Sequence, residues 1–501
     1  MKETKGIAHN AEAYLNQGIA YFNKGDLGKA IADWSETIRF DSNDAVAYFN
    51  RGIAYFNKGD LDKAIADYSE AIRLDPKYTE AYFNRGVVCF NKGGLDKAMA
   101  DFTEAIRLNP NYALAYNNRA VVRFNKGDPD KAIADYSEAI RLDPNLALAY
   151  NNRGGVRFGK GELDKSMADY NEAIRLNPDY ADARYNRGLA YFKKGDIDRA
   201  LADYSEAIRL NPNYTEAYNS RGFAYFSKGE LDKSMADYNE AIRLDPNYVD
   251  AYINRGVAYS KERDHSRAVA DFTEAIRLNP RFAGAYNNRG LAYYKKGDIG
   301  RSLADYGEAI RLGPHYAEAY LNRGIAYAKK GDYDKALADY SEAIRLGPSL
   351  AGAYKYRGNI YFHKGNRGKA MADWNEAIRL DPNDAEAYNN RGVAYNDKGD
   401  RDKAMADYNE AIRLDPNYAD AYYSRGLAYF NKGDIDNAVA DWSAAIRLDP
   451  INVEAYNNRG AAYTEKGDFA RARTDWEKAL QIDPTHAVVR KNLEVLRQMG
   501  R

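Results

Sequence analysis

The stretch Ala45–Tyr78, AVAYFNRGIAYFNKGDLDKAIADYSEAIRLDPKY, contains two apolar patterns at helical spacing, separated by Gly59-Asp60 and closed by Pro76. Numbered from Ala45, positions 4, 8 and 11 share one face of a first helix, and positions 17, 20, 21, 24, 27 and 28 form the apolar face of a second. Gly accepts the left-handed conformation that ends a helix, Asp can cap the next helix, and Pro ends it. The stretch therefore predicts a helix, a tight turn and a second helix.

This 34-residue pattern recurs fourteen times without a gap from Ala11 to His486, which is nearly all of the 501 residues. Position 4 is Tyr in thirteen repeats, position 8 is Gly in thirteen, position 24 is aromatic in all, and position 32 is Pro in thirteen. Gly at position 8 should leave space for the ring at position 24. A fixed period of this length predicts stacked helix pairs.

The pattern resembles the tetratricopeptide repeat (TPR) family, whose signature has an aromatic at position 4, Leu-Gly at 7 and 8, Tyr at 11, Ala at 20, an aromatic at 24, Ala at 27 and Pro at 32. The resemblance implies an all-α, right-handed superhelical solenoid of fourteen helix-turn-helix repeats with a concave groove. We expect an N-terminal segment over residues 1–10, the repeats over 11–486 and a C-terminal capping helix over 487–501. An apolar stripe should dock that helix; it consists of Val488, Val489, Leu493, Leu496 and Met499.

One position departs from the family signature throughout the chain. Position 7 is Arg, not Leu, in thirteen repeats, while position 23 is Asp in all fourteen. The first repeat alone lacks the Arg and has Gln17. We therefore predict a ladder of ion pairs in which each Arg contacts the Asp of the preceding repeat, as in Arg51 with Asp33.

Composition excludes several classes of protein. The 73 Lys and Arg balance 73 Asp and Glu, which argues against nucleic-acid or membrane-surface binding by bulk positive charge. No apolar run approaches the roughly 18 residues of a membrane span. The single Cys89 excludes a disulfide framework within the chain, and the five His show no ligand spacing. We expect no metal, no cofactor and no catalytic constellation, and therefore no enzyme.

The opening residues MKETKGIAHN have no apolar stretch behind their charges. A cytoplasmic protein is expected, and an extracellular one would require that a signal had already been removed.

The first helix of each repeat has a second stripe, which in the family lines the concave surface. Position 6 in this stripe is Asn in eleven repeats, and a carboxamide can donate to and accept from the backbone of an extended chain. The row resembles the asparagine ladder in the TPR domain of O-linked N-acetylglucosamine transferase. It consists of Asn16, Asn50, Asn84, Asn118, Asn152, Asn186, Asn254, Asn288, Asn322, Asn390 and Asn458.

An aromatic row at position 12 and a lysine row at position 13 accompany the asparagines. Position 2 is in addition acidic in nine repeats. Position 12 is aromatic in ten repeats and includes Phe56, Phe90, Phe124, Phe158, Phe192 and Phe226; position 13 carries Lys193, Lys261, Lys295 and Lys329. In a purely structural alternative, the Asn side chains satisfy neighbouring backbone groups or water, and the Phe row packs between first helices.

The sequence favours a non-enzymatic scaffold that binds extended polypeptides or partner proteins along this face by many weak contacts. The alternative is a structural protein that self-assembles into filaments, because its ends resemble its interior surfaces. Single-stranded RNA in the groove is the least favoured prediction. The carboxylate clamp of the family is rejected, because it needs Asn at position 9, which is mostly aliphatic. Repeats 3 to 5 (Cys89, Arg123, Arg157) and the Gly-free turn of repeat 8 are candidate special sites.

Overall fold

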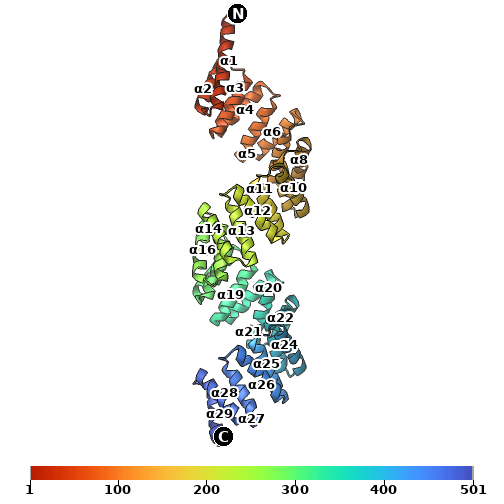
Figure 1. Cartoon of the computed structure of the whole chain (residues 1–501), viewed down its shortest axis with the longest axis vertical. Coiled ribbons are helices and arrows are strands. Elements are labelled where there is room, and N and C mark those ends of the chain that lie inside the picture. The colour runs from red at the N-terminus through yellow and green to blue at the C-terminus, as the bar shows by residue number, and fades with distance from the viewer. Residues whose placement is uncertain (1, 499–501) are drawn as a thin grey trace. The chain divides into compact units, whose positions relative to one another are not determined.

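The computed structural model describes residues 2–498, and every regular element in this range is an α-helix (Figure 1). The first fourteen helices are α1 (Lys2–Asn23), α2 (Leu27–Phe40), α3 (Ala45–Asn57), α4 (Leu61–Leu74), α5 (Thr79–Asn91), α6 (Leu95–Leu108), α7 (Ala113–Asn125), α8 (Pro129–Leu142), α9 (Ala147–Gly159), α10 (Leu163–Leu176), α11 (Ala181–Lys193), α12 (Ile197–Leu210), α13 (Thr215–Lys228) and α14 (Leu231–Leu244). The remaining helices are α15 (Val249–Lys261), α16 (His265–Leu278), α17 (Ala283–Lys295), α18 (Ile299–Leu312), α19 (Ala317–Lys330), α20 (Tyr333–Leu346), α21 (Ala351–His363), α22 (Arg367–Leu380), α23 (Ala385–Asp397), α24 (Arg401–Leu414), α25 (Ala419–Lys432), α26 (Ile435–Leu448), α27 (Val453–Glu465), α28 (Phe469–Ile482) and α29 (Ala487–Gln498). The expected all-α solenoid is confirmed, whereas the hand of the superhelix and the number of repeats stay predictions.

The chain divides into two compact parts, residues 1–254 and 255–501, with the boundary inside α15. Within each part, the two helices of a repeat pack against each other, and the second packs against the first helix of the next repeat. Small residues make this close packing possible: Ala47, Ala54, Ala64 and Ala71, at positions 3, 10, 20 and 27, are fully buried. Each part is therefore a stack of helix pairs with a core that continues from repeat to repeat.

The turn inside the repeat has the predicted chemistry. Gly59 has a φ of 85°, and the carboxylate of Asp60 accepts a hydrogen bond from the backbone N–H of Lys63 at 3.4 Å. In the turn of repeat 8, Arg263 adopts a φ of 63°, the only positive value of a non-glycine residue among the described residues. Asp264 still caps the next helix at 3.0 Å. The turn of repeat 8 is thus a variant with the same geometry.

Gly at position 8 has the predicted role of making room for the aromatic ring at position 24. A Cβ atom added to Gly52 would lie 2.8 Å from a ring carbon of Tyr68, which is itself only 1% exposed. Such a distance is shorter than carbon atoms tolerate. The Gly at position 8 therefore sets how closely the two helices of a repeat approach.

The Arg at position 7 pairs with the Asp of its own repeat, so the predicted contact between Arg51 and Asp33 is wrong. Nε and Nη2 of Arg51 each donate to Asp67 at 2.8 Å, and Nη1 donates to Oγ of Ser35 in the preceding repeat at 3.0 Å. The same bidentate pair joins positions 7 and 23 in all thirteen repeats that have the Arg. The helix pair brings these positions together, and the link between repeats passes through position 25.

The first repeat shows the cost of lacking this Arg. Asp33 has the same place on its helix as Asp67, but Gln17 stands where its partner would be. Its Oδ2 atom is buried without a hydrogen-bond partner in the described residues, and desolvation raises the pKa of Asp33.

Both ends of the array differ in part from the prediction. Residues 2–10, expected as a separate segment, continue the first helix, α1. At the other end, α29 docks as the expected capping helix, because Val489, Leu493 and Leu496 are buried in one cluster with repeat 14. Val488 was wrongly placed in that stripe, since it is 55% exposed. Met499 lies outside the described residues.

Between residues 2 and 498, no helix combines the length and the apolar content that crossing a bilayer demands. In the same range, no three His, Cys, Asp or Glu side chains gather in a group that could hold a metal ion.

Candidate peptide-binding groove

The position 6 asparagines link successive repeats through their side chains. Nδ2 of Asn186 donates to Oδ1 of Asn151 at 3.0 Å, and Asn254 donates to Asn219 at the same distance. Each bond runs from position 6 to position 5 of the preceding repeat. Equivalent bonds are Asn152 to Asn117, Asn322 to Asn287, Asn458 to the Tyr423 hydroxyl, and Asn492 of α29 to Asn457. We call this series the amide ladder; it gives part of the predicted row a structural role.

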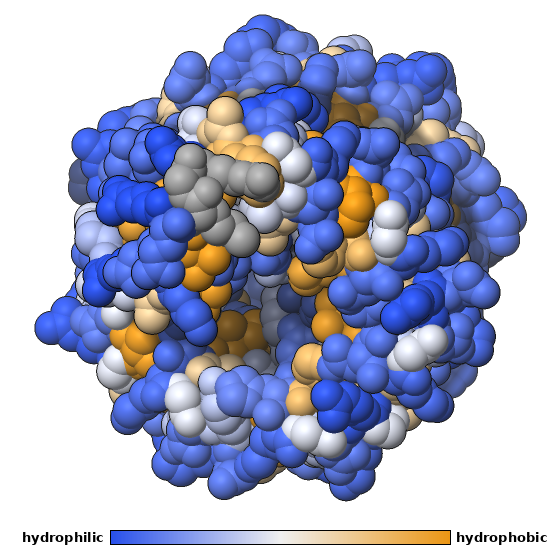
Figure 2. All heavy atoms as spheres, turned by 90° about the horizontal axis from the view of Figure 1, so that it is seen from below, coloured by the Kyte–Doolittle hydropathy of each residue, from blue (hydrophilic) through white to orange (hydrophobic). Residues whose placement is uncertain are grey.

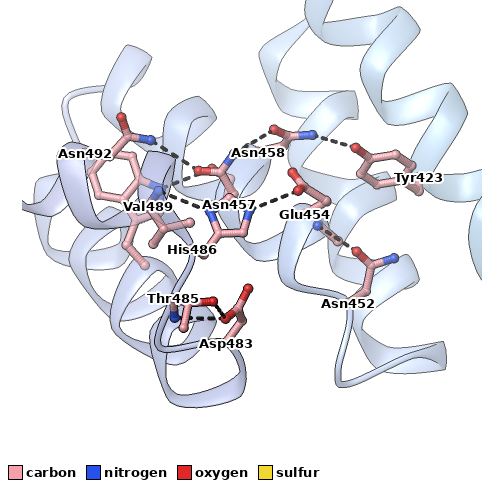
Figure 3. A network of polar contacts seen from close by, with 12 residues as sticks. Tyr423, Asn452, Glu454, Asn457, Asn458, Asp483, Thr485, His486, Val489 and Asn492 are labelled. Carbon is pink, nitrogen blue, oxygen red and sulfur yellow. Dashed lines mark hydrogen bonds and ion pairs between the residues drawn. The ribbon is translucent and has the colours of Figure 1, made fainter.

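Figure 3 shows the last rungs of the amide ladder in the C-terminal part. Asn492 donates to Asn457 at 3.2 Å, Asn457 donates to Oδ1 of Asn458 at 3.3 Å, and Asn458 donates to Tyr423 at 3.1 Å. The amide ladder therefore continues through repeat 14 into the capping helix.

A rung of the amide ladder forms where position 5 of the preceding repeat is Asn or Tyr. Asn390 instead donates to Oδ1 of Asn359, at position 9 of repeat 11, at 3.0 Å. Apolar Leu15, Phe49 and Phe83 stand at position 5 before Asn50, Asn84 and Asn118. In residues 2–498, none of these three asparagines bonds to the preceding repeat; the Asn84 amide instead donates to a carbonyl of its own helix at 2.8 Å. These half-buried carboxamides retain hydrogen-bonding capacity for a ligand.

The asparagine and aromatic rows meet around cavities in the N-terminal part. One cavity of about 300 Å³ is lined by Phe90, Asn118 and Asn152 together with aliphatic side chains. Another of about 310 Å³ is lined by Phe192 and Asn254. The structure thus brings these predicted residues together around shared cavities.

The remaining aromatic residues show both predicted behaviours. Phe56 packs against the buried cluster of Tyr68, whereas Phe124 is 49% exposed. Phe158 and Phe226 are half-buried. The Phe row is therefore partly packing and partly accessible surface.

The four predicted lysines lie at the surface and line none of the cavities described here. Lys193, Lys261, Lys295 and Lys329 are all exposed. Nζ of Lys193 lies 4.9 Å from the ring centre of Phe158 in the preceding repeat, a cation–π distance. This contact adds charge beside the aromatic row without entering a cavity.

The departures in repeats 3 to 5 have structural explanations. Arg123 and Arg157, where other repeats have Tyr, are second partners of Asp135 and Asp169, at 2.9 and 2.8 Å. Cys89 is 4% exposed, and burial raises the pKa of its thiol. These three positions therefore serve the repeat core.

Repeat 11 contains functional candidates that the sequence analysis missed. Its first helix, α21, has Lys355, Tyr356 and Asn359 at positions 5, 6 and 9, where no other repeat has Lys, Tyr or Asn respectively. Asn359 lines a cavity of about 670 Å³ with Asn390. A column-by-column comparison of positions 5, 6 and 9 would have revealed this helix.

The face that these rows occupy is hollowed in the C-terminal part as well. There, Phe362 and Asn390 of the same rows line one cavity. Figure 2, seen from the C-terminal end of Figure 1, shows hydrophilic side chains over most of the surface and apolar side chains around a hollow. Carboxamides, aromatic rings and cavities therefore occur together along these helices.

Comparison with known families identifies the class. The model described as TPR repeat matches residues 18–59, 54–93, 156–195, 188–229, 222–262, 358–399, 394–433 and 428–467. Models described as tetratricopeptide repeat match residues 289–351, 79–112, 113–146, 249–282 and 453–486. The chain therefore belongs to the tetratricopeptide repeat family, a membership that supports a protein-interaction scaffold.

Solved structures agree with this fold. The APC/C hetero-tetramer Cut9-Hcn1 matches with a TM-score of 0.50 at 16% identity, over 97% of this chain and 96% of that chain. The yeast Tom70 structure matches with a TM-score of 0.40 at 19% identity, over 90% of this chain and 99% of that chain. YrrB, described as a TPR protein with an unusual peptide-binding site, matches with a TM-score of 0.32 at 28% identity, over 39% of this chain and 97% of that chain. The first likeness shows the fold alone. No curated protein matches the chain.

Proposed function

We propose that this protein is a non-enzymatic scaffold that binds an extended polypeptide along the face formed by positions 2, 5, 6, 9, 12 and 13 of the first helices. The observation that carries the proposal is the cavity lined by Phe90, Asn118 and Asn152, where the asparagine and aromatic rows meet. Carboxamides pair with peptide groups, and the aromatic ring covers a side chain. Repetition of the arrangement makes the summed contacts strong although each is weak.

The amide ladder refines the mechanism. Rungs such as Asn152 to Asn117 use the amide donor inside the protein. Such an asparagine retains for a ligand its second N–H and the acceptor capacity of Oδ1, which match a backbone C=O and a backbone N–H. Asparagines without a rung, such as Asn50, offer both a donor and an acceptor.

The test uses the asparagines without a rung, because their loss leaves every bond between repeats in place; Asn118 accepts only from Asn117 of its own repeat. The triple variant Asn50→Ala, Asn84→Ala and Asn118→Ala is compared with wild type on an array of random 15-residue peptides. Each lost hydrogen bond costs about 0.5–1.5 kcal/mol, so affinity should fall by tenfold or more.

The matched control changes three exposed loop asparagines, Asn43, Asn111 and Asn145, to Ala. It should bind peptides as wild type does. Equal affinity of the two triple variants, both folded by circular dichroism, would contradict the proposed face.

The two alternative functions stay predictions. In α29, buried Val489, Leu493 and Leu496 cover the last repeat. A single sedimenting species over a wide concentration range would exclude filaments. RNA binding would show a steep dependence on salt.

A further inference from the structure

We propose that the cavity between α21, α23 and α25 receives the guanidinium group of an arginine side chain in the bound polypeptide. This inference rests on the proposed function and specifies its ligand. The cavity lies wholly in the C-terminal part and has a volume of about 670 Å³. Its aromatic walls are Phe362, Trp374, Tyr418 and Tyr423, and its carboxylates are Glu386 and Asp420.

One of the residues that line this cavity carries an orphaned acceptor. Asn389 is 4% exposed and lines the cavity, and its Oδ1 atom is buried without a donor in the described residues. In the cavity of repeats 3 to 5, the equivalent Asn117 receives a rung from Asn152. Here Ser424 stands in the place of Asn152, and no bond joins it to Asn389 in the range described. A buried carbonyl oxygen left unpaired is costly, and a donor from a ligand would satisfy it.

One carboxylate at the cavity is also unpaired. Asp420 makes no ion pair among residues 2–498, although it lies at the accessible rim. Desolvation by the surrounding protein raises the pKa of Asp420, and the nearby carboxylates of Asp449 and Glu386 add to the effect. A cation at this rim would relieve the repulsion.

The second carboxylate is held in place by residues specific to repeat 11. Nζ of Lys355 lies 2.8 Å from Oε2 of Glu386 and 3.0 Å from Asp384. Nδ2 of Asn359 donates to Oε1 of Glu386 at 3.4 Å, while its Oδ1 accepts from Nε1 of Trp374 at 2.9 Å. Glu386 is thus fixed before a ligand arrives, which lowers the entropic cost of binding.

The charge around the cavity favours a cation over an anion. Two cations lie near the cavity, and both are already paired. Lys355 is shared by Asp384 and Glu386 with only 12% of its side chain exposed. Arg367, 5.6 Å from the ring centre of Phe362, lies 3.0 Å from Asp397. Asp420 adds a further negative charge, and His363 completes the rim. A peptide carboxylate entering this site would therefore meet excess negative charge.

Arginine fits this set of groups better than lysine. A guanidinium is planar and can stack on aromatic rings, and its five N–H donors can reach two carboxylates and the Asn389 oxygen together. A lysine ammonium offers a strongly hydrated point charge with three donors.

The test measures binding of the full-length protein to an array of random 15-residue peptides. Each arginine in the binders is then replaced by citrulline, lysine or norleucine. Citrulline keeps the shape and loses the charge, so affinity should fall about tenfold, as expected for charged hydrogen bonds. Lysine should recover only part of the affinity; full recovery would overturn the guanidinium assignment.

Protein variants locate the effect. Asp420→Asn and Glu386→Gln should each reduce the preference for arginine over citrulline, and both should retain binding to peptides without arginine. Asp402→Asn, at an exposed site outside the cavity, is the matched control and should keep the preference. Thermal melting verifies that all variants fold.

The outcomes separate the two proposals. Peptide binding without any arginine preference, or a preference that survives both cavity variants, overturns this inference and leaves the proposed scaffold intact. Absence of binding to every peptide overturns the proposed function and this inference with it.

Discussion

The cavity of repeats 3 to 5 and the cavity of repeats 11 to 13 are built from the same repeat positions and differ in chemistry. Phe90 and Asn118 in the first correspond to Phe362 and Asn390 in the second. The first has Leu148 at position 2 of its last repeat, whereas the second has Asp420. The comparison shows that the same repeat positions line both cavities and that position 2 differs between them; in our proposal this difference determines which side chain each cavity accepts.

Removing the Arg at position 7 from the middle repeat of each cavity should have the largest effect, which is on the free energy of unfolding. Arg391→Ala leaves Asp407, 6% exposed, without its partner, and an unpaired buried charge costs about 3–5 kcal/mol. Arg119→Ala should cost about half as much, because Arg123 still pairs with Asp135. Urea unfolding of both variants measures the difference. Equal losses would show that Arg123 does not compensate.

Exchanging position 2 should exchange the preferences of the two cavities. Asp420→Leu should reduce arginine binding about tenfold, and Leu148→Asp should add arginine binding to the cavity of repeats 3 to 5. Paired arginine and norleucine peptides measure each preference by fluorescence anisotropy. An unchanged ratio in Asp420→Leu would mean that position 2 does not set the charge of the cavity.

Restoring the missing rung should give the unpaired Oδ1 of Asn389 in the second cavity a hydrogen-bond donor. In Ser424→Asn, the new amide can donate to Asn389 as Asn152 does to Asn117. Stability should rise by about 1 kcal/mol, and arginine affinity should fall about threefold to tenfold. Calorimetry and peptide titration check the two effects together. Stronger arginine binding by this variant would contradict the role of the unpaired oxygen.

Giving the second cavity the position 9 residue of the first should have the smallest effect on stability and on arginine affinity. Asn359→Val copies Val87 and releases Glu386 from one hydrogen bond. The fold should lose about 1 kcal/mol, since Trp374 can donate to a backbone carbonyl at position 5 as Trp34 does. The half-buried amide of Asn390, which loses its 3.0 Å bond to Asn359, can donate to water instead. Arginine affinity should fall about threefold. A loss of several kcal/mol in thermal unfolding would show that Asn359 is chiefly structural.

The repeat period made the fold predictable, because Gly at position 8, the ring at 24 and the Gly-Asp turn each have one local explanation. Pairing between repeats was harder to predict. Asp33 and Asp67 occupy the same column, so the sequence alone could not tell which of them Arg51 contacts. The amide ladder was not predicted for a related reason. Its bonds depend on position 5, which varies between repeats, whereas the near-constant position 6 gives no sign of where a bond forms. The site of repeat 11 was missed because its signal is a combination of changes in one helix.

The most direct test is a crystal structure of the full chain with a bound arginine peptide. The guanidinium should lie in the cavity of repeats 11 to 13, with nitrogen atoms about 2.7–3.2 Å from Asp420 and from Oδ1 of Asn389. A peptide bound on another face, or on this face with the cavity empty of its arginine, would contradict the account.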